Sequence, residues 1–364
     1  MDLPGSMIRN ARMTRLLLVL AAVTLLLLPG AASAAVCTPL NCAASQFTVG
    51  NGGLLAYRHS ALGPVSVTSL RTGKVLHRVP GGFSGGTLLV HQKSGKTLQW
   101  FDLRSGAVRG VATLPWKVRL AGVSQDGTRA IGFRLVPDGA TTLVVASRAA
   151  VRTFVLPGRQ WDFDALRGNN LFLVRYLSTG GYQVRYLDLR TGRLAPSPLK
   201  DPHESGTIWG IPFARLATAD GNVLFTLYVA SNGAAMVHQL DLVQATARCI
   251  DLPGTGDFLS ASTWALALSR NGKTLWAVSP GYGRVVSLDV ATRRVDSAFQ
   301  FELANWDRAT GTRIALRGDG TELAVANGAE VARIALTERK VLERTRRQAT
   351  AVAWSPTGEL LTLR

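Results

Sequence analysis

Leu189-Arg190-Thr191-Gly192 decides the fold, because an apolar residue followed by a Thr-Gly or Ser-Gly turn recurs along the chain. Full copies begin at Leu70, Leu103 and Leu189, degenerate copies without the Gly begin at Leu242, Val290 and Leu336, and a weak copy occupies residues 146–148. Successive copies lie 33 to 53 residues apart. An Asp often precedes the apolar residue, as in Asp102, Asp188, Asp241 and Asp289. This regular spacing predicts an array of similar structural units.

A second repeated signal is a hairpin that is flanked by apolar residues. The hairpins are centred on Asp126-Gly127, Asp220-Gly221, Asn271-Gly272, Asp319-Gly320 and Thr357-Gly358. Asp-Gly and Asn-Gly favour type I′ turns between antiparallel strands. Two strands around each hairpin and two around each Thr-Gly turn make a four-stranded blade.

We therefore predict an all-β fold, a β-propeller over residues 46–364 with seven blades of four antiparallel strands each; six or eight blades remain alternatives. Residues 351–364 follow the last unit. We expect them to close the ring by pairing with N-terminal strands, because a propeller must remove its open edges.

Two repeated motifs carry a resemblance to a known group. The hairpins Ser124-Gln125-Asp126-Gly127 and Ser269-Arg270-Asn271-Gly272, with the Leu-Asp-Leu-x-Thr-Gly turns, resemble the TolB-like and WD-repeat-like propellers of exported bacterial proteins. The resemblance covers residues 46–364. It implies architecture and says little about activity, because turn residues define the scaffold.

The first 34 residues have the pattern of a secretory signal peptide. Arg9, Arg12 and Arg15 precede an apolar run over residues 16–28, and Ala32-Ser33-Ala34 forms a small-residue cleavage site. An uncleaved membrane anchor is the alternative. The pattern predicts a secreted protein or one of the cell envelope, with membrane contact only if the segment is retained.

Cysteine and charge add two expectations about the exported chain. In an oxidising compartment Cys37 and Cys42 could form a disulfide within residues 35–45, leaving Cys249 as an odd thiol buried beside Ile250. The formal net charge is +18, and loss of residues 1–34, with three Arg and one Asp, lowers it to +16. Such a protein should attract anionic envelope polymers; the alternative is background charge scattered over a solvated surface. We expect a monomer with no specific nucleic-acid partner.

The segments predicted to connect blades are rich in Trp and charge. The candidate ligand-binding residues are Trp116, Trp161, Asp162, Asp164, Trp209, Trp306, Asp307 and Arg308. Flat aromatic rings beside charges suit sugar rings, peptides or planar ligands, whereas packing of the Trp rings between blades is the alternative. Asp162 and Asp164 alternate, so on an extended segment both would point the same way, towards a cation or an Arg.

No catalytic constellation is recognisable in the sequence. The five His have no metal-ligand spacing, and no nucleophile elbow, phosphate loop or dinucleotide fingerprint occurs. We therefore assign no catalytic residue, metal ligand or cofactor. We predict a non-enzymatic, exported binding module that recognises a protein, peptide or envelope glycan through its Trp-rich loops. The alternative is a channel-centred hydrolase or lyase, with or without a divalent cation.

Overall fold

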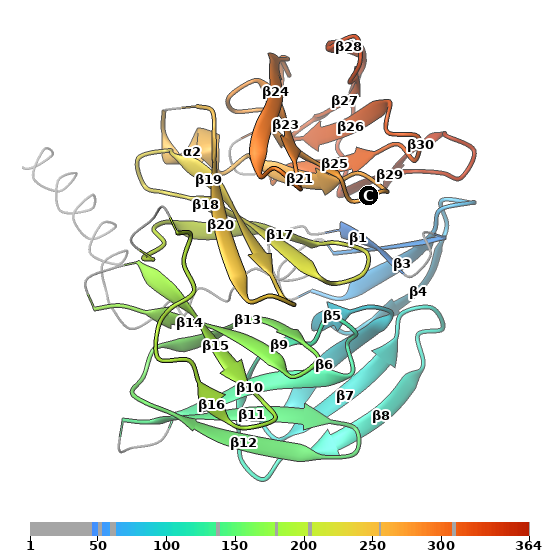
Figure 1. The fold of residues 1–364 in the computed structure, drawn as a ribbon. Helices are drawn as coiled ribbons and strands as arrows, with labels where there is room; N and C mark the ends of the chain where they lie inside the picture. The colour runs from blue at the N-terminus through green and yellow to red at the C-terminus, as the bar shows by residue number, and fades with distance from the viewer. Residues whose placement is uncertain are drawn as a thin grey trace, which may run out of the picture. The chain divides into compact units, whose positions relative to one another are not determined.

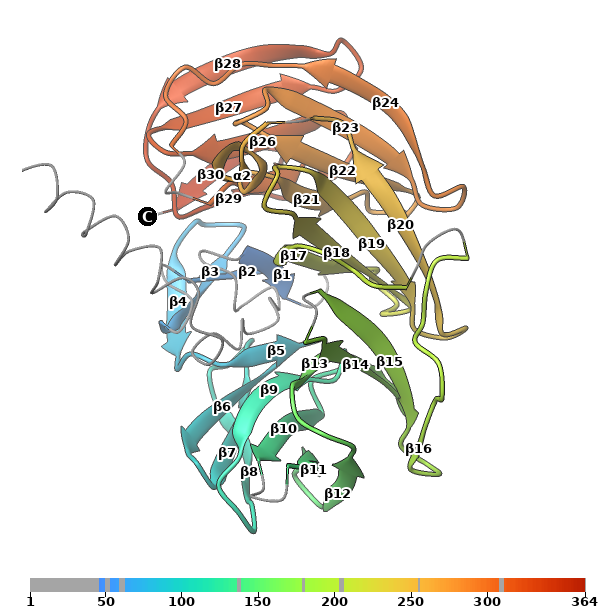
Figure 2. The same cartoon turned by 90° about the vertical axis from the view of Figure 1, so that its left-hand side faces the viewer.

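The computed structural model describes residues 46–49, 53–58, 63–135, 139–178, 181–202, 206–254, 256–307 and 311–363. These residues form a ring of seven four-stranded antiparallel blades and one two-stranded sheet (Figures 1 and 2). The predicted all-β propeller with seven blades is confirmed. The predicted signal peptide, Cys37 and Cys42 lie outside the described residues. Within the described residues, no helix has the length and apolar character needed to cross a membrane.

The strands of each blade follow one another in sequence. Blade 1 contains β1 (Gln46–Val49), β2 (Leu54–Tyr57), β3 (Val65–Ser69) and β4 (Val75–Val79). Blade 2 contains β5 (Phe83–Gly85), β6 (Leu88–Ser94), β7 (Thr97–Asp102) and β8 (Val108–Thr113). Blade 3 contains β9 (Arg119–Val123), β10 (Arg129–Leu135), β11 (Thr141–Ser147) and β12 (Val151–Leu156). Blade 4 contains β13 (Trp161–Arg167), β14 (Asn170–Tyr176), β15 (Tyr182–Asp188) and β16 (Arg193–Leu194).

The second half of the ring repeats this order. Blade 5 contains β17 (Ile211–Ala217), β18 (Val223–Val229), β19 (Ala235–Asp241) and β20 (Thr246–Leu252). Blade 6 contains β21 (Ala265–Leu268), β22 (Thr274–Ser279), β23 (Arg284–Asp289) and β24 (Arg294–Gln300), and α2 (Phe258–Ala261) precedes it. Blade 7 contains β25 (Arg313–Leu316), β26 (Glu322–Asn327), β27 (Glu330–Ala335) and β28 (Lys340–Arg346). In Figure 2 the first strands surround the centre of the ring and the fourth strands lie outside.

Neighbouring blades bury their apolar faces against each other. Between blades 3 and 4, for example, Leu143 and Phe163 lie in one cluster with Leu171 and Leu173. A blade is therefore covered on both faces, which explains why second strands such as β14 and β18 are nearly continuously apolar. Burial of this kind, repeated around the ring, is the main stabilising contribution to the fold.

The C-terminal strands close the ring differently from the prediction. β29 (Ala351–Trp354) and β30 (Leu360–Leu363) pair with each other, not with N-terminal strands. Trp354 packs in the interface with blade 7, and Leu363 packs against blade 1. The side chain of Gln46 donates to the Val352 carbonyl at 2.6 Å and accepts from the Val352 amide at 2.7 Å. A side chain therefore provides the link to blade 1 that strand pairing was expected to make.

The Asp of the first repeated motif caps the turn between the third and fourth strands. Asp102 Oδ1 accepts the amides of Arg104 at 2.7 Å and Ser105 at 3.1 Å. The glycine that ends this turn, Gly106, has a φ of 72°. Where the repeat is degenerate, other residues take this left-handed conformation: Ala245 (52°), Arg293 (61°) and Arg339 (54°). Side chains with a Cβ are unfavourable there, which explains the preference for Gly.

The second motif forms a different turn from the one predicted. In the hairpin at Ser124, the Gly127 amide donates to the Ser124 carbonyl at 2.8 Å, and Gly127 has a φ of 72°. Asp126 is not at positive φ, as a type I′ turn would require. The turn is therefore type I followed by a left-handed glycine. Asp126 accepts hydrogen bonds from Ser124 and Thr128, which favours this arrangement.

Both repeated motifs lie on the same face of the ring. Because strand direction alternates, the hairpins between first and second strands share a face with the turns between third and fourth strands. We call this the motif face. The opposite side, here called the crossover face, carries the hairpins between second and third strands and the connections to the next blade. In Figure 1, α2 on a crossover connection and the β29–β30 turn lie on opposite sides of the ring.

Candidate functional site

Three of the four candidate Trp residues lie on connections of the crossover face, as expected. Trp116 precedes β9 and is half-buried, Trp209 precedes β17 and is 55% exposed, and Trp306 precedes β25 and is half-buried. Trp161 is different, because it is the first residue of β13 and is only 4% exposed. The expectation that Trp161 lies in a connecting loop is wrong. Arg308 lies outside the described residues.

Asp162 and Asp164 also lie in β13 and not in a loop. Both are buried, with 1% and 3% of their surface exposed. Asp162 pairs with Arg119 of blade 3 at 3.2 Å, and Asp164 forms an ion pair with Arg215 of blade 5. The strand β13 therefore links two neighbouring blades through charge. The alternation of Asp162 and Asp164 suggested an Arg partner, and each carboxylate has one. The two Arg residues come from the blades on either side of blade 4.

Burial dominates the electrostatics around these carboxylates. It raises the pKa of Asp162, and the nearby Arg119 opposes this only in part. The pKa of Tyr176 is raised by burial and by the charge of Asp162. The fully buried guanidinium of Arg215 has its pKa lowered to about 9 by burial, with Asp162 opposing the shift. The charged forms of these side chains at the centre of the ring are therefore destabilised by the loss of hydration.

A second buried polar cluster lies at the edge of the interface between blades 4 and 5. His238 in β19 lies opposite Cys249 in β20. Asp201 accepts Arg248 Nη1 at 2.8 Å and the Cys249 amide at 3.0 Å. Burial, and then the charge of Arg215, lower the pKa of His238 to about 4, while Asp201 acts in the opposite direction. Sequence reasoning missed this cluster, since its members are far apart in the chain. Cys249 is only partly buried, contrary to the prediction.

Arginine side chains lie over aromatic rings at the crossover ends of blades 3 and 4. The Arg134 guanidinium is 4.9 Å from the centre of the Trp116 ring, and Arg175 is 5.5 Å from that of Trp161. Arg119 lies 5.5 Å from the Phe133 ring. Contact with a ring restricts the guanidinium groups of Arg134 and Arg175, while Arg119 is also paired with Asp162.

An exposed apolar group occupies the crossover face of blades 4 to 6. It contains Trp209, Ile211 (48% exposed) and Leu259 (47% exposed), and we call it the Trp209 group. Two aromatic side chains of the same segments, Phe213 of β17 and Phe258 of α2, pack with ring centres 5.6 Å apart. Exposed apolar side chains gathered on a supported surface are typical of an interaction site.

The last candidate segment is held in place by the neighbouring blade. The Asp307 amide donates to Asn327 Oδ1 at 2.6 Å, and the Asn305 amide donates to Glu330 Oε2 at 2.9 Å. Trp306 packs against the cluster between blades 6 and 7. This packing agrees with the alternative that the Trp306 ring lies between blades, while Asp307 is exposed beside it.

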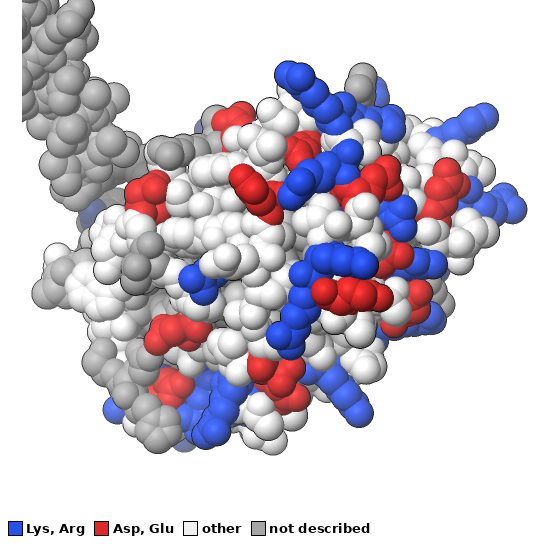
Figure 3. All heavy atoms as spheres, turned by 90° about the horizontal axis from the view of Figure 1, so that it is seen from above, with Lys and Arg blue, Asp and Glu red and all other residues white. Residues whose placement is uncertain are grey.

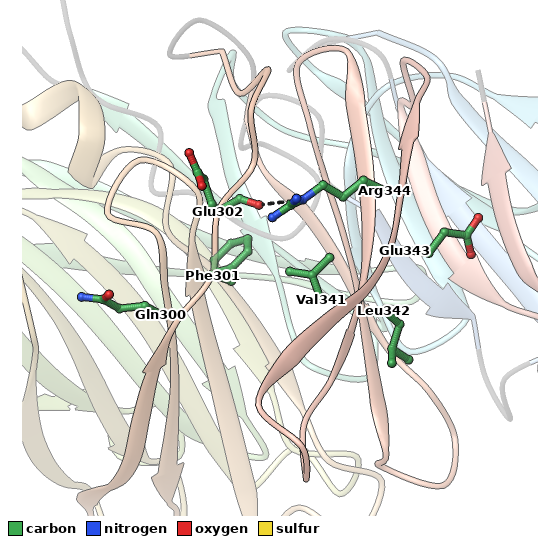
Figure 4. A pocket seen from close by; sticks show the side chains of 7 residues that line it. All are labelled: Gln300, Phe301, Glu302, Val341, Leu342, Glu343 and Arg344. Atoms are coloured by element: carbon green, nitrogen blue, oxygen red, sulfur yellow. Dashed lines mark hydrogen bonds between the residues drawn. The ribbon is translucent and has the colours of Figure 1, made fainter.

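A shallow groove of about 510 Å³ lies between the outer strands of blades 6 and 7 (Figure 4). Phe301 and Val341 line it together with charged residues from β28. Arg344 crosses the groove and donates from Nε to the Glu302 carbonyl at 3.1 Å. Because an internal contact already spans it, the groove is a weaker candidate than the crossover face.

In the described part of the chain, no group of three His, Cys, Asp or Glu side chains is arranged to bind a metal ion. No protein-family model matches the chain, and no curated protein matches its sequence.

Solved structures share the fold. AztD from Citrobacter koseri is 11% identical, covers 87% of each chain and has a TM-score of 0.54. Its apo form is 12% identical, covers 83% of this chain and 85% of that one, and also scores 0.54. The β-propeller domain of Myceliophteria thermophila Cps50 (Swd1) is 14% identical, covers 87% of this chain and 89% of that one, and scores 0.46. The AztD likeness supports the propeller fold alone. The finer resemblance to TolB-like proteins stays a prediction.

Proposed function

We propose that this protein is an exported, non-enzymatic binding module that holds a protein, peptide or envelope glycan on its crossover face. The observation that carries this proposal is the Trp209 group. Trp209 and Ile211 leave about half of their surface in water, and Phe213 in the same segment packs against Phe258 of α2. Large aromatic anchors on rigid supports supply much of the affinity in binding sites.

The division of the ring into two faces supports the same proposal. On the motif face, the side chains of the repeats are engaged in turn formation, as Asp102 and Asp126 illustrate. On the crossover face, the connections differ from blade to blade in length and composition. Irregular loops on a rigid scaffold are where proteins usually place recognition.

The hydrolase or lyase alternative gains no support from the carboxylates at the centre. Asp162 and Asp164 are each paired with an Arg and are almost wholly buried. A general acid or base must reach the atom whose proton it transfers. Neither carboxylate is placed to do so without rearrangement of an ion pair.

Replacement of Trp209 by Ala tests the proposal. The protein should keep its stability, because an exposed side chain is removed, while its co-sedimentation with envelope preparations should fall several-fold. Leu76→Ala is the matched control, since Leu76 is 53% exposed on β4, an outer strand of blade 1. Equal retention of the wild type and the Trp209 variant would show that the binding surface lies elsewhere.

A further inference from the structure

Cations accumulate on the crossover face of blades 2 to 4. The members of this cationic surface are Lys93, Lys96, Lys117, Arg119, Arg134, Arg159 and Arg175. Residues 92–97, 113–119, 155–161 and 174–182 contain no Asp or Glu, and residues 133–141 contain one, Asp138, which lies outside the described residues. Asp162, three residues after Arg159, is buried and paired with Arg119. Basic residues therefore outnumber acidic ones in these segments, and the three lysines are exposed.

Lysine is rare in this chain, and the lysines are concentrated on the cationic surface. The chain contains seven lysines against 34 arginines, and three of the seven lie within residues 93–117. All three, Lys93, Lys96 and Lys117, are exposed. By contrast, the side of the molecule over β24 and β28 mixes basic and acidic side chains without a continuous basic area (Figure 3). The lysines are thus not spread evenly over the surface.

Two segments of blade 2 hold these lysines together. The Leu114 amide donates to the Lys96 carbonyl at 2.7 Å, and the Val118 amide donates to the Gly95 carbonyl at 2.9 Å. Gln92 Nε2 donates to the Val118 carbonyl at 2.7 Å. The hairpin of Lys93 and Lys96 is therefore bonded to the connection that carries Trp116 and Lys117. A site fixed in this way binds with a smaller loss of entropy than a mobile loop would.

We propose that this surface binds an acidic polysaccharide, with Lys93, Lys96 and Lys117 holding its carboxylates and Trp116 lying against a sugar ring. The inference rests on the proposed function, because both require the crossover face to be the binding face. It goes further by naming the chemical class of the ligand. A polysaccharide with one carboxylate on each sugar presents anions separated by apolar ring faces, and this surface presents ammonium groups beside a tryptophan.

Other anionic partners fit the surface less well. Single-stranded nucleic acid binds with successive bases stacked on several aromatic rings, whereas residues 92–97 and 113–119, which carry the lysines, contain one aromatic residue, Trp116. An acidic membrane would also take up apolar side chains, and the Trp209 group that could supply them lies on blades 4 to 6. Duplex DNA and phosphatidylglycerol vesicles are therefore the competing probes in the test.

The test compares two triple variants that remove the same net charge. Lys93→Gln/Lys96→Gln/Lys117→Gln neutralises the crossover lysines, and Lys74→Gln/Lys273→Gln/Lys340→Gln neutralises three exposed lysines of the motif face. The probe is polygalacturonate, measured by titration calorimetry at low and physiological salt, with its methyl ester as the uncharged match. The first triple variant should weaken binding at least tenfold and the second less than twofold. The methyl ester should not bind, and Trp116→Leu should weaken binding of polygalacturonate several-fold.

Several outcomes would overturn the inference: no binding of polygalacturonate, equal losses in both triple variants, or unchanged binding in Trp116→Leu. Tighter binding of duplex DNA or of the vesicles, lost in the first triple variant, would assign the surface to another partner and overturn it too. If Trp209→Ala lowers envelope binding while the lysine variants do not matter, the proposed function stands and this inference fails. If neither replacement matters, both fail.

Discussion

The buried His238 should make the stability of the propeller fall as the solution becomes acidic. His238 is 2% exposed, and burial with the charge of Arg215 lowers its pKa from 6.5 to about 4. In the unfolded chain the imidazole takes up a proton near pH 6.5, whereas in the folded protein it stays neutral down to about pH 4. Its contribution to stability is therefore complete above pH 6.5 and is lost progressively as the pH falls towards 4.

The size of this effect follows from the pKa difference. Each unit corresponds to about 1.4 kcal/mol, so the fall from 6.5 to about 4 corresponds to roughly 3 kcal/mol. The free energy of unfolding, measured by denaturant titration between pH 4 and pH 8, should therefore show a pH dependence that His238→Gln reduces by this amount. The test compares how the free energy of unfolding changes with pH, so a loss of stability that is the same at every pH does not affect it.

His77→Gln provides the matched control. His77 is partly exposed, and its Nε2 lies 2.9 Å from the Leu103 carbonyl oxygen. The change in slope caused by His238→Gln should exceed any change caused by His77→Gln. If the curve of His238→Gln runs parallel to that of the wild type over the whole range, burial does not keep His238 neutral and the reasoning is refuted.

Two further predictions concern stability. Arg339→Gly should raise the free energy of unfolding by up to about 1 kcal/mol, because Arg339 is exposed and has a φ of 54°. Gly192 occupies the equivalent turn with a φ of 74°, so Gly192→Ala should lower the free energy of unfolding by about 1 to 2 kcal/mol. Similar changes in both variants would contradict this explanation. Asp164→Ala should lower the free energy of unfolding by about 3 to 5 kcal/mol, because it leaves Arg215 buried without its carboxylate. The double variant Asp164→Leu/Arg215→Met should recover much of this loss. A double variant as unstable as the single one would refute the ion-pair argument.

The blades could be predicted from the sequence because their turns are determined by local chemistry. Asp102 bonds to amides two and three residues ahead, and Gly106 takes a left-handed conformation within the same turn. Such contacts leave a signature in a few consecutive residues, which the spacing then repeats. The turn type was wrong because Asp-Gly suits both type I′ turns and type I turns with a following left-handed Gly.

The candidate site was harder to predict because its contacts are distant in sequence. Asp162 looked like part of a charged loop, yet its partner Arg119 lies 43 residues away, and Arg215 lies 51 residues from Asp164. In an exposed strand a carboxylate at every second position would mark a solvated face. Here both point to guanidinium groups of neighbouring blades, and nothing within a local window reveals this.

The connections of the crossover face explain why recognition would concentrate there. Three residues join β4 to β5, whereas sixteen join β16 to β17, including Trp209. The motif turns keep one geometry because a change of length would break their amide contacts. The crossover connections only have to reach the next blade, so their length and charge can vary without loss of the ring. Lys96 lies in a hairpin and Lys117 in the connection that is hydrogen-bonded to this hairpin. Together they show how variation in these segments can produce a surface that does not recur from blade to blade.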